Sequence, residues 1–445
     1  MKRVYAWILY DFASSSYAVI ILAVIFSKFF AQTVAGGQAG LEWQLLGMTV
    51  HIPGASLFTF IVALSMLAVA IGSPILGALA DYSGRRRRYL IWGALIGIAA
   101  TAMLYFSGPG TIKWAAFWFI VSNIGFAGAN VFYNSFLIDI SSQKESGWVS
   151  GLGYAAGYLG GGLLLVINFF AFRIYPGYTE QMTFLTVSVW WFLFSIPLFR
   201  HVRDYRPLIP AGEMGGYLKI GWRRFVKTFR HLDELPQLLR FLIAFLLYND
   251  GVETVIIMAA IFGAQHLGMD TVQLILFFLM IQGTAMLGAL LFGKLADHFG
   301  HRPILLLQMG FWSLLLLWAY FLGILFEPLQ EFWMLGFLTG LVMGGSQTVS
   351  RSLQRLFTPE HMSAEFFGFF AVSGKFATIL GPLFYGLIII WTNDIRSGML
   401  ILLLFFFGGG LFLLFVNEKA GIIQAESFDR KFKPVSLTPP AEGNC

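Results

Sequence analysis

Long apolar segments follow one another along nearly the whole chain. Each contains about 20 residues or more, the length that an α-helix needs to cross the hydrocarbon core of a bilayer, whereas a membrane β-strand needs about 10. Only 12% of the 445 residues are charged, which is about half the share expected in a soluble domain. The sequence therefore predicts an all-α membrane protein with twelve transmembrane helices, at about residues 5–32, 55–80, 89–107, 113–139, 147–172, 183–199, 237–264, 271–296, 303–325, 331–356, 364–391 and 396–416.

Lysine and arginine are distributed unevenly among the loops between these segments. They concentrate in 85–88, 200–230, 294–302 and 419–433, whereas the loops in between contain almost none. Because the positively charged loops of membrane proteins stay in the cytoplasm, this pattern predicts cytoplasmic positions for both termini and an even number of helices. The exceptions to the pattern are Lys113, Arg173 and Arg396.

A long basic loop near the middle of the chain divides it into two parts. We predict an N-terminal six-helix half at 1–200, a cytoplasmic linker at 201–236 and a C-terminal six-helix half at 237–416. Residues 221–235 of the linker have the apolar stripe of an amphipathic surface helix; a solvated helix that simply lies against the bundle is the alternative. The polar, proline-containing tail at 417–445 is expected to be disordered.

One short motif occurs twice, at corresponding positions in the two halves. Its pattern is Gly-x-Leu-Ala-Asp-x-x-Gly-x-Arg, and each copy joins two apolar segments. Glycine permits a tight turn there, and the arginines can pair with the motif aspartate or with the carbonyl end of a neighbouring helix. Anchoring of the loop by positive charge alone is the alternative. The motif residues are Gly77, Asp81, Gly84, Arg85 and Arg86 in the first copy, and Gly293, Asp297, Gly300 and Arg302 in the second.

The paired motif resembles the signature loop between the second and third helices of major facilitator superfamily (MFS) transporters, together with its echo between the eighth and ninth. The resemblance implies the MFS fold, in which two pseudo-symmetric six-helix halves enclose a central site. In that superfamily the loop latches the cytoplasmic side while the protein is open to the outside. We therefore expect Asp81 to form part of a latch.

Further motifs resemble a narrower branch of the superfamily. The first apolar segment carries Trp7-x-x-Tyr10-Asp11-Phe12-Ala13-x-Ser15-x-Tyr17, which is similar to the opening motif of the Atg22-like (UMF1) branch. The other matches are residues 248–252, 344–347 with 350–352, and 364–368 with 373–375. Eukaryotic members of the branch are vacuolar amino-acid effluxers, so the resemblance implies amino-acid export.

Polar residues inside the apolar segments form the candidate transport site, because ionisable groups are costly at membrane depth and face the interior of a bundle. Asp250 and Glu253 are three residues apart on one helical face, where two negative charges are hard to maintain. Such a pair suits proton exchange or the binding of a substrate ammonium group; structural pairing with Lys375 is the alternative. We expect Lys375 to face the cavity, opposite the small residues of its own helix.

The remaining candidates lie on the first, fourth, seventh and tenth apolar segments. One face of the first segment is polar, and the fourth and tenth each carry polar residues at four-residue spacing. This spacing predicts either cavity lining or interhelical hydrogen bonds, and Arg351 could instead act in a cytoplasmic gate. The residues are Tyr10, Asp11, Ser14, Tyr17, Asn130, Asn134, Asn249, Gln347 and Arg351.

The sequence and this resemblance thus predict a secondary active transporter in a bacterial inner membrane or a vacuolar equivalent. It would export a small zwitterionic solute, an amino acid as the resemblance implies, by alternating access. Protons are the candidate coupling ion. The chain has neither a His-Glu-x-x-His helix nor a Gly-x-Ser-x-Gly turn, so we expect no enzyme. We also expect no metal or other cofactor, no nucleic-acid partner, and a monomer in the bilayer. The alternatives are an MFS exporter of a peptide, a drug or a lipid, and a non-transporting receptor on a transporter fold.

Overall fold

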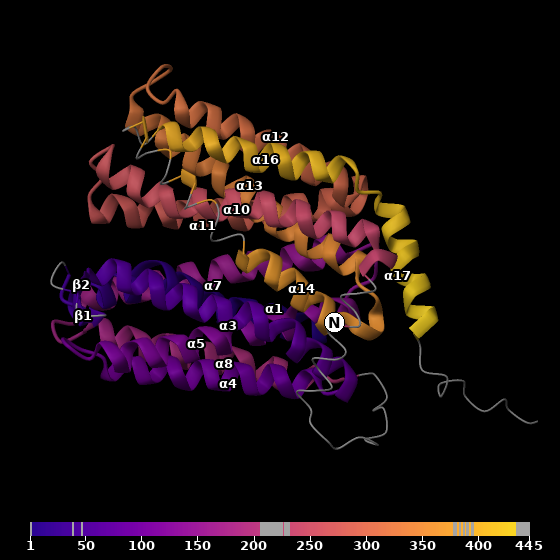
Figure 1. Cartoon of the computed structure of the whole chain (residues 1–445), viewed down its shortest axis with the longest axis horizontal. Coiled ribbons are helices and arrows are strands. Elements are labelled where there is room, and N and C mark those ends of the chain that lie inside the picture. Colours follow the sequence, from indigo (N-terminus) through magenta and orange to yellow (C-terminus); the bar gives the residue numbers. More distant parts are fainter. Residues whose placement is uncertain are drawn as a thin grey trace, which may run out of the picture.

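The computed structural model describes residues 2–37, 40–45, 48–204, 226, 232–376, 381, 384–385, 388, 391–392 and 396–432. Long helices run side by side along the long axis of the molecule (Figure 1). Within the described residues, ten helical segments are long and apolar enough to cross a membrane. The predicted all-α membrane fold is confirmed, and the count of twelve spans stays a prediction.

The first half of the chain begins with one continuous helical rod. It runs through α1 (Lys2–Tyr17), the wide π-helical turns η1 (Ala18–Val24), α2 (Ile25–Phe29) and a second π-helical stretch, η2 (Phe30–Val34). The helices that follow are α3 (Gly54–Ser83), α4 (Arg86–Met103) with the short η3 (Leu104–Phe106), α5 (Ile112–Ser135), α6 (Leu137–Ile140), α7 (Ser146–Ile174) and α8 (Glu180–His201).

The second half starts its helices with clear local signals. Pro236 and Pro328 occupy the first turns of their helices, where the missing N–H has no partner to lose, and Asp270 forms a reciprocal capping box with Gln273. The elements are η4 (Leu232–Glu234), α10 (Pro236–Gln265), α11 (Thr271–Phe299), α12 (His301–Tyr320), α13 (Pro328–Phe357), η5 (Glu360–Met362), α14 (Ser363–Phe376), α16 (Ser397–Leu414) and α17 (Glu418–Phe432).

The outer surface of the bundle is apolar. On α3, Phe60, Leu64, Leu67 and Ile71 recur every three or four residues, and each is about half exposed or more. A soluble protein of this size does not normally expose such a continuous apolar stripe. The stripe is therefore the face that α3 presents to lipid.

The two halves form two neighbouring layers of helices, indigo to magenta for the first and pink to yellow for the second (Figure 1). Two helices make most of the connection between them. The helix α7 of the first half packs on α11 and α13, while α14 of the second half packs on α3 and α5. The halves thus exchange equivalent contacts, as the predicted pseudo-symmetry requires.

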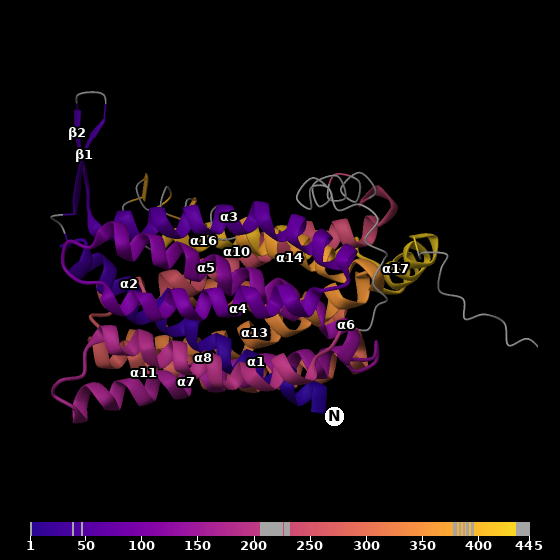
Figure 2. The ribbon, with the colours of Figure 1, turned by 90° about the horizontal axis from the view of Figure 1, so that it is seen from below.

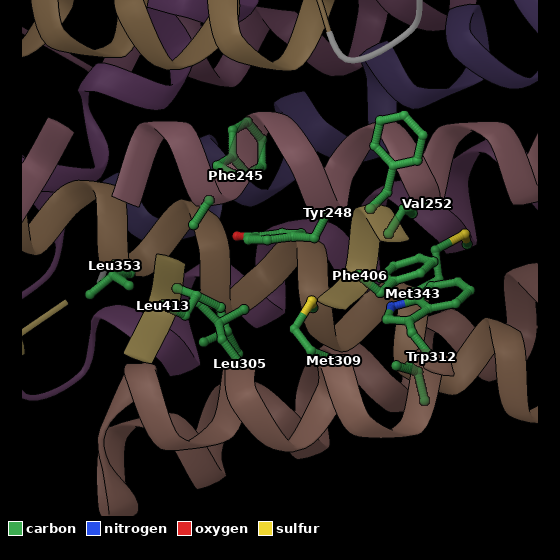
Figure 3. Close-up of a cluster of buried hydrophobic side chains, with 14 of the residues drawn as sticks. Phe245, Tyr248, Val252, Leu305, Met309, Trp312, Met343, Leu353, Phe406 and Leu413 are labelled. Carbon is green, nitrogen blue, oxygen red and sulfur yellow. The ribbon is translucent and has the colours of Figure 1, made fainter. Parts of the chain in front are cut away.

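Each half has its own hydrophobic core. In the second half the core includes Trp312, whose ring stacks on Phe406 with a centroid distance of 5.2 Å, and Figure 3 shows these rings beside Met309 and Met343. In the first half, Phe26 and Trp7 are fully buried among other aromatic rings. The second-half core also includes Val131 and Ile138 of the first half, and the first-half core includes Ala364 of α14, so the two cores meet where the halves touch.

Two segments differ from the expectation. Residues between the first two apolar segments form an antiparallel hairpin of β1 (Leu41–Leu45) and β2 (Met48–Ile52), which projects from one end of the bundle (Figure 2).

The predicted disorder of the tail is wrong for Glu418–Phe432, which form α17 at the opposite end. We call the end of the bundle with β1 and β2 the hairpin end, and the opposite end, where α17 lies, the basic end. Residues 433–445, and most of the predicted surface helix at 221–235, lie outside the described residues.

Candidate functional site

The first copy of the motif joins the two halves at the basic end. Asp81 lies in the last turn of α3, and its Oδ2 accepts the backbone N–H of Glu365 in the first turn of α14 at 2.9 Å. Arg86 is buried, and its guanidinium donates to Asp139 at 2.6 Å and to the Ser363 hydroxyl at 2.5 Å. The Nε atom of Arg86 lies 3.9 Å from Asp81. Carboxylate, guanidinium and helix N-terminus together form a charged contact between the halves.

The second copy makes the equivalent contact with a different set of charges. Asp297 accepts the N–H groups of Gly147 and Trp148 at the start of α7, both at 2.7 Å. The buried side chain 3.8 Å from Asp297 is His301, the first residue of α12. The Arg302 side chain points away and donates to the carbonyl group of Leu413 at the end of α16. Both motif aspartates therefore bind a helix N-terminus in the opposite half.

When the helix boundaries of the two loops are compared, the residues that correspond in the structure differ by one position from those that the sequence motif aligns. In the first loop Gly84 ends α3 and Arg85 precedes α4, whereas in the second Gly300 fills both positions. Arg86 thus corresponds to His301 in space. Arg87, which donates to the Phe199 carbonyl at the end of α8, corresponds to Arg302. Arg87 and Arg302 thus both donate to carbonyl groups at the ends of neighbouring helices, while Arg85 is exposed.

The glycines of the motif have two separate roles. Gly84 and Gly300 have φ values of 62° and 94°, so they make the turns that the motif predicts. Gly77 and Gly293 lie inside helices, where a Cβ atom would overlap the carbonyl groups of Ala364 and Gly147 across the interface. A tight turn is therefore the wrong reason for these two; they allow close helix packing between the halves.

A carboxylate that follows the last helix of each half completes the basic end. Asp204 follows α8 and accepts the N–H of Arg87 at 3.2 Å; Glu418 follows α16 and accepts the N–H groups of His301 and Arg302 at 2.9 and 3.0 Å. Burial raises the pKa of the Asp204 carboxyl above its ordinary value, and the bond from Arg87 offsets only part of this. Burial acts the same way on Glu418, but its hydrogen bonds with His301 and Arg302 outweigh it and lower the pKa.

Deeper in the bundle, Arg351 of α13 reaches into the first half. Its guanidinium, on a residue that is only 1% exposed, donates to Asp11 of α1 at 2.9 Å. It also donates to the hydroxyl of Ser150 at 3.0 Å and to Asn134 at 3.3 Å, and it lies 3.9 Å from the centroid of the Tyr154 ring. Ser150 is three residues from Gly147, which binds Asp297 at the basic end, so this position agrees with both roles predicted for Arg351, in the transport site and in a gate.

Aromatic and polar side chains of α7 border the same region, and the sequence analysis did not identify them. Tyr158 donates to Gln347 of α13 at 2.5 Å, so Tyr154 and Tyr158 both connect the halves. They are four residues apart, on the face of α7 next to the glycine ridge. That spacing is the signal that could have identified them.

The acidic residues of α10 occupy two different environments. Asp250 is fully buried, and its Oδ1 accepts the N–H of Gly381 at 2.8 Å, while its Oδ2 has no hydrogen-bond partner among the described residues. Glu253 is close enough to Lys375 for their charges to interact, and Tyr154 and Tyr158 lie near Glu253 as well. Asp11, Arg351 and Glu253 thus all lie near Tyr154.

Several predicted residues lie elsewhere. The Tyr10 ring lies tilted against Tyr133 inside the first half, and Tyr17 packs against Phe126 and Trp191 in the same core. Ser14 and Asn249 are buried on their helices, and Asn130 is half-buried. The residues that the structure brings together are Asp11, Asn134, Gln347 and Arg351, with Glu253 and Lys375 near them.

A sequence profile of the family described as "Vacuole effluxer Atg22 like" matches residues 1–426. The chain belongs to this family. It is 31% identical over 430 residues to the MFS-type transporter YxiO of Bacillus subtilis (strain 168), covering 94% of this chain and 95% of YxiO. It is 25% identical over 471 residues to autophagy-related protein 22 of Eremothecium gossypii, covering 96% of this chain and 92% of that protein.

Solved structures support the same fold. The human organic anion transporter MFSD10 superposes with a TM-score of 0.69 at 14% identity, over 93% of this chain and 99% of MFSD10. A bacterial homologue of the iron transporter ferroportin, solved in the outward-facing state, gives 0.66 at 12% identity, over 93% of this chain and 98% of the homologue. The protein is therefore an integral membrane MFS transporter of the Atg22-like family, and not an enzyme.

Proposed function

We propose that this transporter exports a small zwitterionic solute, an amino acid, in exchange for protons. We further propose that it acts as a monomer in a bacterial inner membrane, with the basic end and both termini in the cytoplasm. Its membership of a family described as vacuole effluxers supports export, and the basic loops at one end of the bundle support the orientation.

The observation that carries this proposal is the Asp11–Arg351 ion pair between the halves. A buried ion pair is strongly destabilised when one partner is removed, because the other charge stays uncompensated. A zwitterion avoids this penalty: its carboxylate can replace Asp11 on Arg351, while its ammonium group binds Asp11 or Glu253. A guanidinium binds a carboxylate with two parallel hydrogen bonds, and the Tyr154 ring under Arg351 orients it. Such a solute separates the halves without leaving a charge unpaired.

Proton coupling rests on the two acidic residues of α10. Lys375 carries a single charge and interacts with Glu253, so it can compensate only one of Asp250 and Glu253. The other carboxylate in this low-dielectric region is stable with a bound proton or a bound ammonium group. Because proton and solute compete for one negative charge, the movement of one is linked to the countermovement of the other. Asp11 is a candidate relay.

Ligand identity is tested by thermal unfolding of the purified protein with amino acids, nucleosides, peptides or lipids. A ligand present at 100 times its Kd stabilises the folded state by about 2.7 kcal/mol. We expect an amino acid to raise the Tm of the parent and not that of Arg351→Lys, which keeps the charge and loses the planar fork. A rise with nucleosides, peptides or lipids and with no amino acid would show that the cargo is another class.

Coupling is tested by uptake into proteoliposomes with and without a pH gradient. The variants are Asp250→Asn and Glu253→Gln, with Asp233→Asn on the exposed turn η4 as the control. At least one of the two α10 variants should keep solute exchange and lose accumulation driven by the gradient. Normal accumulation by both would assign these carboxylates a structural role and remove the coupling part of the proposal.

A further inference from the structure

Asp250 is buried in the second half, between α10 and the segment at Gly381. The residue is 0% exposed, and its Oδ1 accepts the Gly381 N–H at 2.8 Å. The Thr254 hydroxyl donates to the backbone carbonyl of Asp250 at 2.7 Å, so it does not serve the carboxyl group. Oδ2 has no hydrogen-bond partner among the described residues. The described part of the chain thus gives this carboxyl group a single hydrogen bond.

The charges around Asp250 do not compensate a negative charge on it. Asp250 takes part in none of the ion pairs between described residues. Glu253 on the same helix acts on it as a second negative charge, while Lys375 of α14 interacts with Glu253. On α13, Arg351 is paired with Asp11. An ionised Asp250 would therefore be a buried charge without a cation.

The contact at Gly381 is too close for any side chain. A Cβ atom there would lie 2.0 Å from Oγ1 of Thr254 and 2.7 Å from Oδ1 of Asp250. On the α16 side of α10, a Cβ atom at Gly251 would lie 2.8 Å from the ring of Phe406, which Figure 3 shows beside α10. Because both neighbours pack this closely, the carboxyl group of Asp250 is enclosed.

We propose that Asp250 carries the coupled proton, on Oδ2, and that the conformation with a closed basic end is the proton-loaded form. An unpaired carboxylate is very costly in a low-dielectric interior, whereas a neutral carboxyl group with one hydrogen bond costs much less. Asp11 and Arg351 neutralise each other in the same conformation, so this form is complete without a solute. The inference rests on the proposed function and assigns its coupling to one carboxyl group and one conformation.

Proton binding then differs between the two forms of the transporter. Since Asp250 has no exposed surface, the proton leaves when α10 separates from the segment at Gly381 and water reaches Oδ2. Exchange for an exported solute requires this release on the cytoplasmic side, in the form that is open at the basic end. By linkage, deprotonation favours that form, and a single proton changes the ratio of the two forms by up to about tenfold per pH unit.

Infrared spectroscopy of the purified protein in lipid measures the proton without any transport. The C=O stretch of a protonated carboxyl group has a higher frequency than that of a carboxylate. We expect this band at neutral pH in the parent, in Glu253→Gln and in the control Asp233→Asn on the exposed turn η4, and its loss in Asp250→Asn. Loss of the band in Glu253→Gln, or its persistence in Asp250→Asn, would overturn the assignment.

Gly381 provides a test of the enclosure. Gly381→Ala places a methyl group against Asp250 and should loosen the contact, so that the band shifts faster after transfer to deuterium oxide. The control is Gly374→Ala on α14, where the nearest atom to the added Cβ would be in the Phe245 ring at 3.4 Å. Equal exchange rates in the parent and in Gly381→Ala would contradict the enclosure of the proton by this contact.

Distances between spin labels on the two halves at the basic end test the link to the conformation. In the parent without solute, rising pH should increase the open population. Asp250→Asn, which stays neutral, should hold the closed form and lose most of this response; a response equal to that of the parent would overturn the proposal. Because no solute is present, these results do not depend on its identity, and a failure here leaves the amino-acid part of the proposed function to the thermal-unfolding test.

Discussion

The two copies of the Gly-x-Leu-Ala-Asp-x-x-Gly-x-Arg motif close the basic end with the same backbone geometry and with different charges. In both, an aspartate binds the first turn of a helix in the other half, and a glycine allows that helix to approach. The buried cation beside the aspartate is Arg86 in the first copy, whereas in the second copy the imidazole of His301 occupies this place. The fold symmetry thus preserves the helix contacts, while the strength of the electrostatic contact differs between the copies.

The largest expected difference between the copies comes from removing the buried cation. Arg86→Ala leaves Asp139 without its guanidinium partner, and breaking such a buried pair costs about 3–5 kcal/mol. His301→Ala should cost less, about 1–2 kcal/mol, because Glu418 keeps the N–H groups at the start of α12. Distances between spin labels placed on the two halves at the basic end, measured in lipid, report how far each variant opens. Equal opening in both variants would contradict the proposed difference in charge.

The next effect comes from the aspartates. Asp81→Asn removes the charge that binds the start of α14 and lies next to Arg86, a loss on the order of 1–3 kcal/mol for a buried charged hydrogen bond. The population should shift towards the form that is open at the basic end. Asp297→Asn should shift it in the same direction and by less, because the cationic side chain described beside Asp297 is the imidazole of His301. Cysteine accessibility at the basic end measures both, and an unchanged Asp81→Asn variant would argue against a latch.

The glycine contacts should behave alike in both copies. Gly77→Ala and Gly293→Ala each push a methyl group into a carbonyl of the opposite half, which costs about 1–2 kcal/mol through overpacking. Gly72→Ala and Gly283→Ala lie on the same two helices with no atom within 4 Å of the added Cβ, so they serve as matched controls. Thermal unfolding and label distances should separate the first pair from the second. A large effect in only one motif position would show that the packing is not symmetric.

The sequence predicted the parts of this arrangement that depend on local pattern. Apolar segments of spanning length indicate membrane helices whatever their partners are, and Asp81 and Asp297 stand out because the motif repeats. The one-residue shift between Arg86 and His301 was not predictable, since it depends on how Gly300 both ends one helix and starts the next.

The contacts between the halves could not be predicted from the sequence pattern either. Asp11 and Arg351 are 340 positions apart, and their pairing follows from the packing of the halves. The helix α17 was missed for a similar reason. Its sequence is polar, and it is held by tertiary contacts, among them buried Phe428 against Phe366 and the bonds of Glu418 to the start of α12. Composition alone gives no sign of these partners.

The smallest expected effect distinguishes the two carboxylates that follow the last helix of each half. The pKa of Glu418 is lowered in the folded protein, so its stabilising contribution is present above the pKa of the unfolded chain and is lost as the pH falls through the folded value. The pKa of Asp204 is raised, so folding is favoured while this carboxyl is protonated, and that advantage is lost as the pH rises through the folded value. Glu418→Gln should therefore lower the Tm at neutral pH by on the order of 1–2 °C and have little effect in acid. Asp204→Asn should keep or slightly raise the Tm at neutral pH. Calorimetric scans of both variants between acid and neutral pH measure this, and parallel pH profiles for the two would show that these symmetric positions do not differ in their electrostatics.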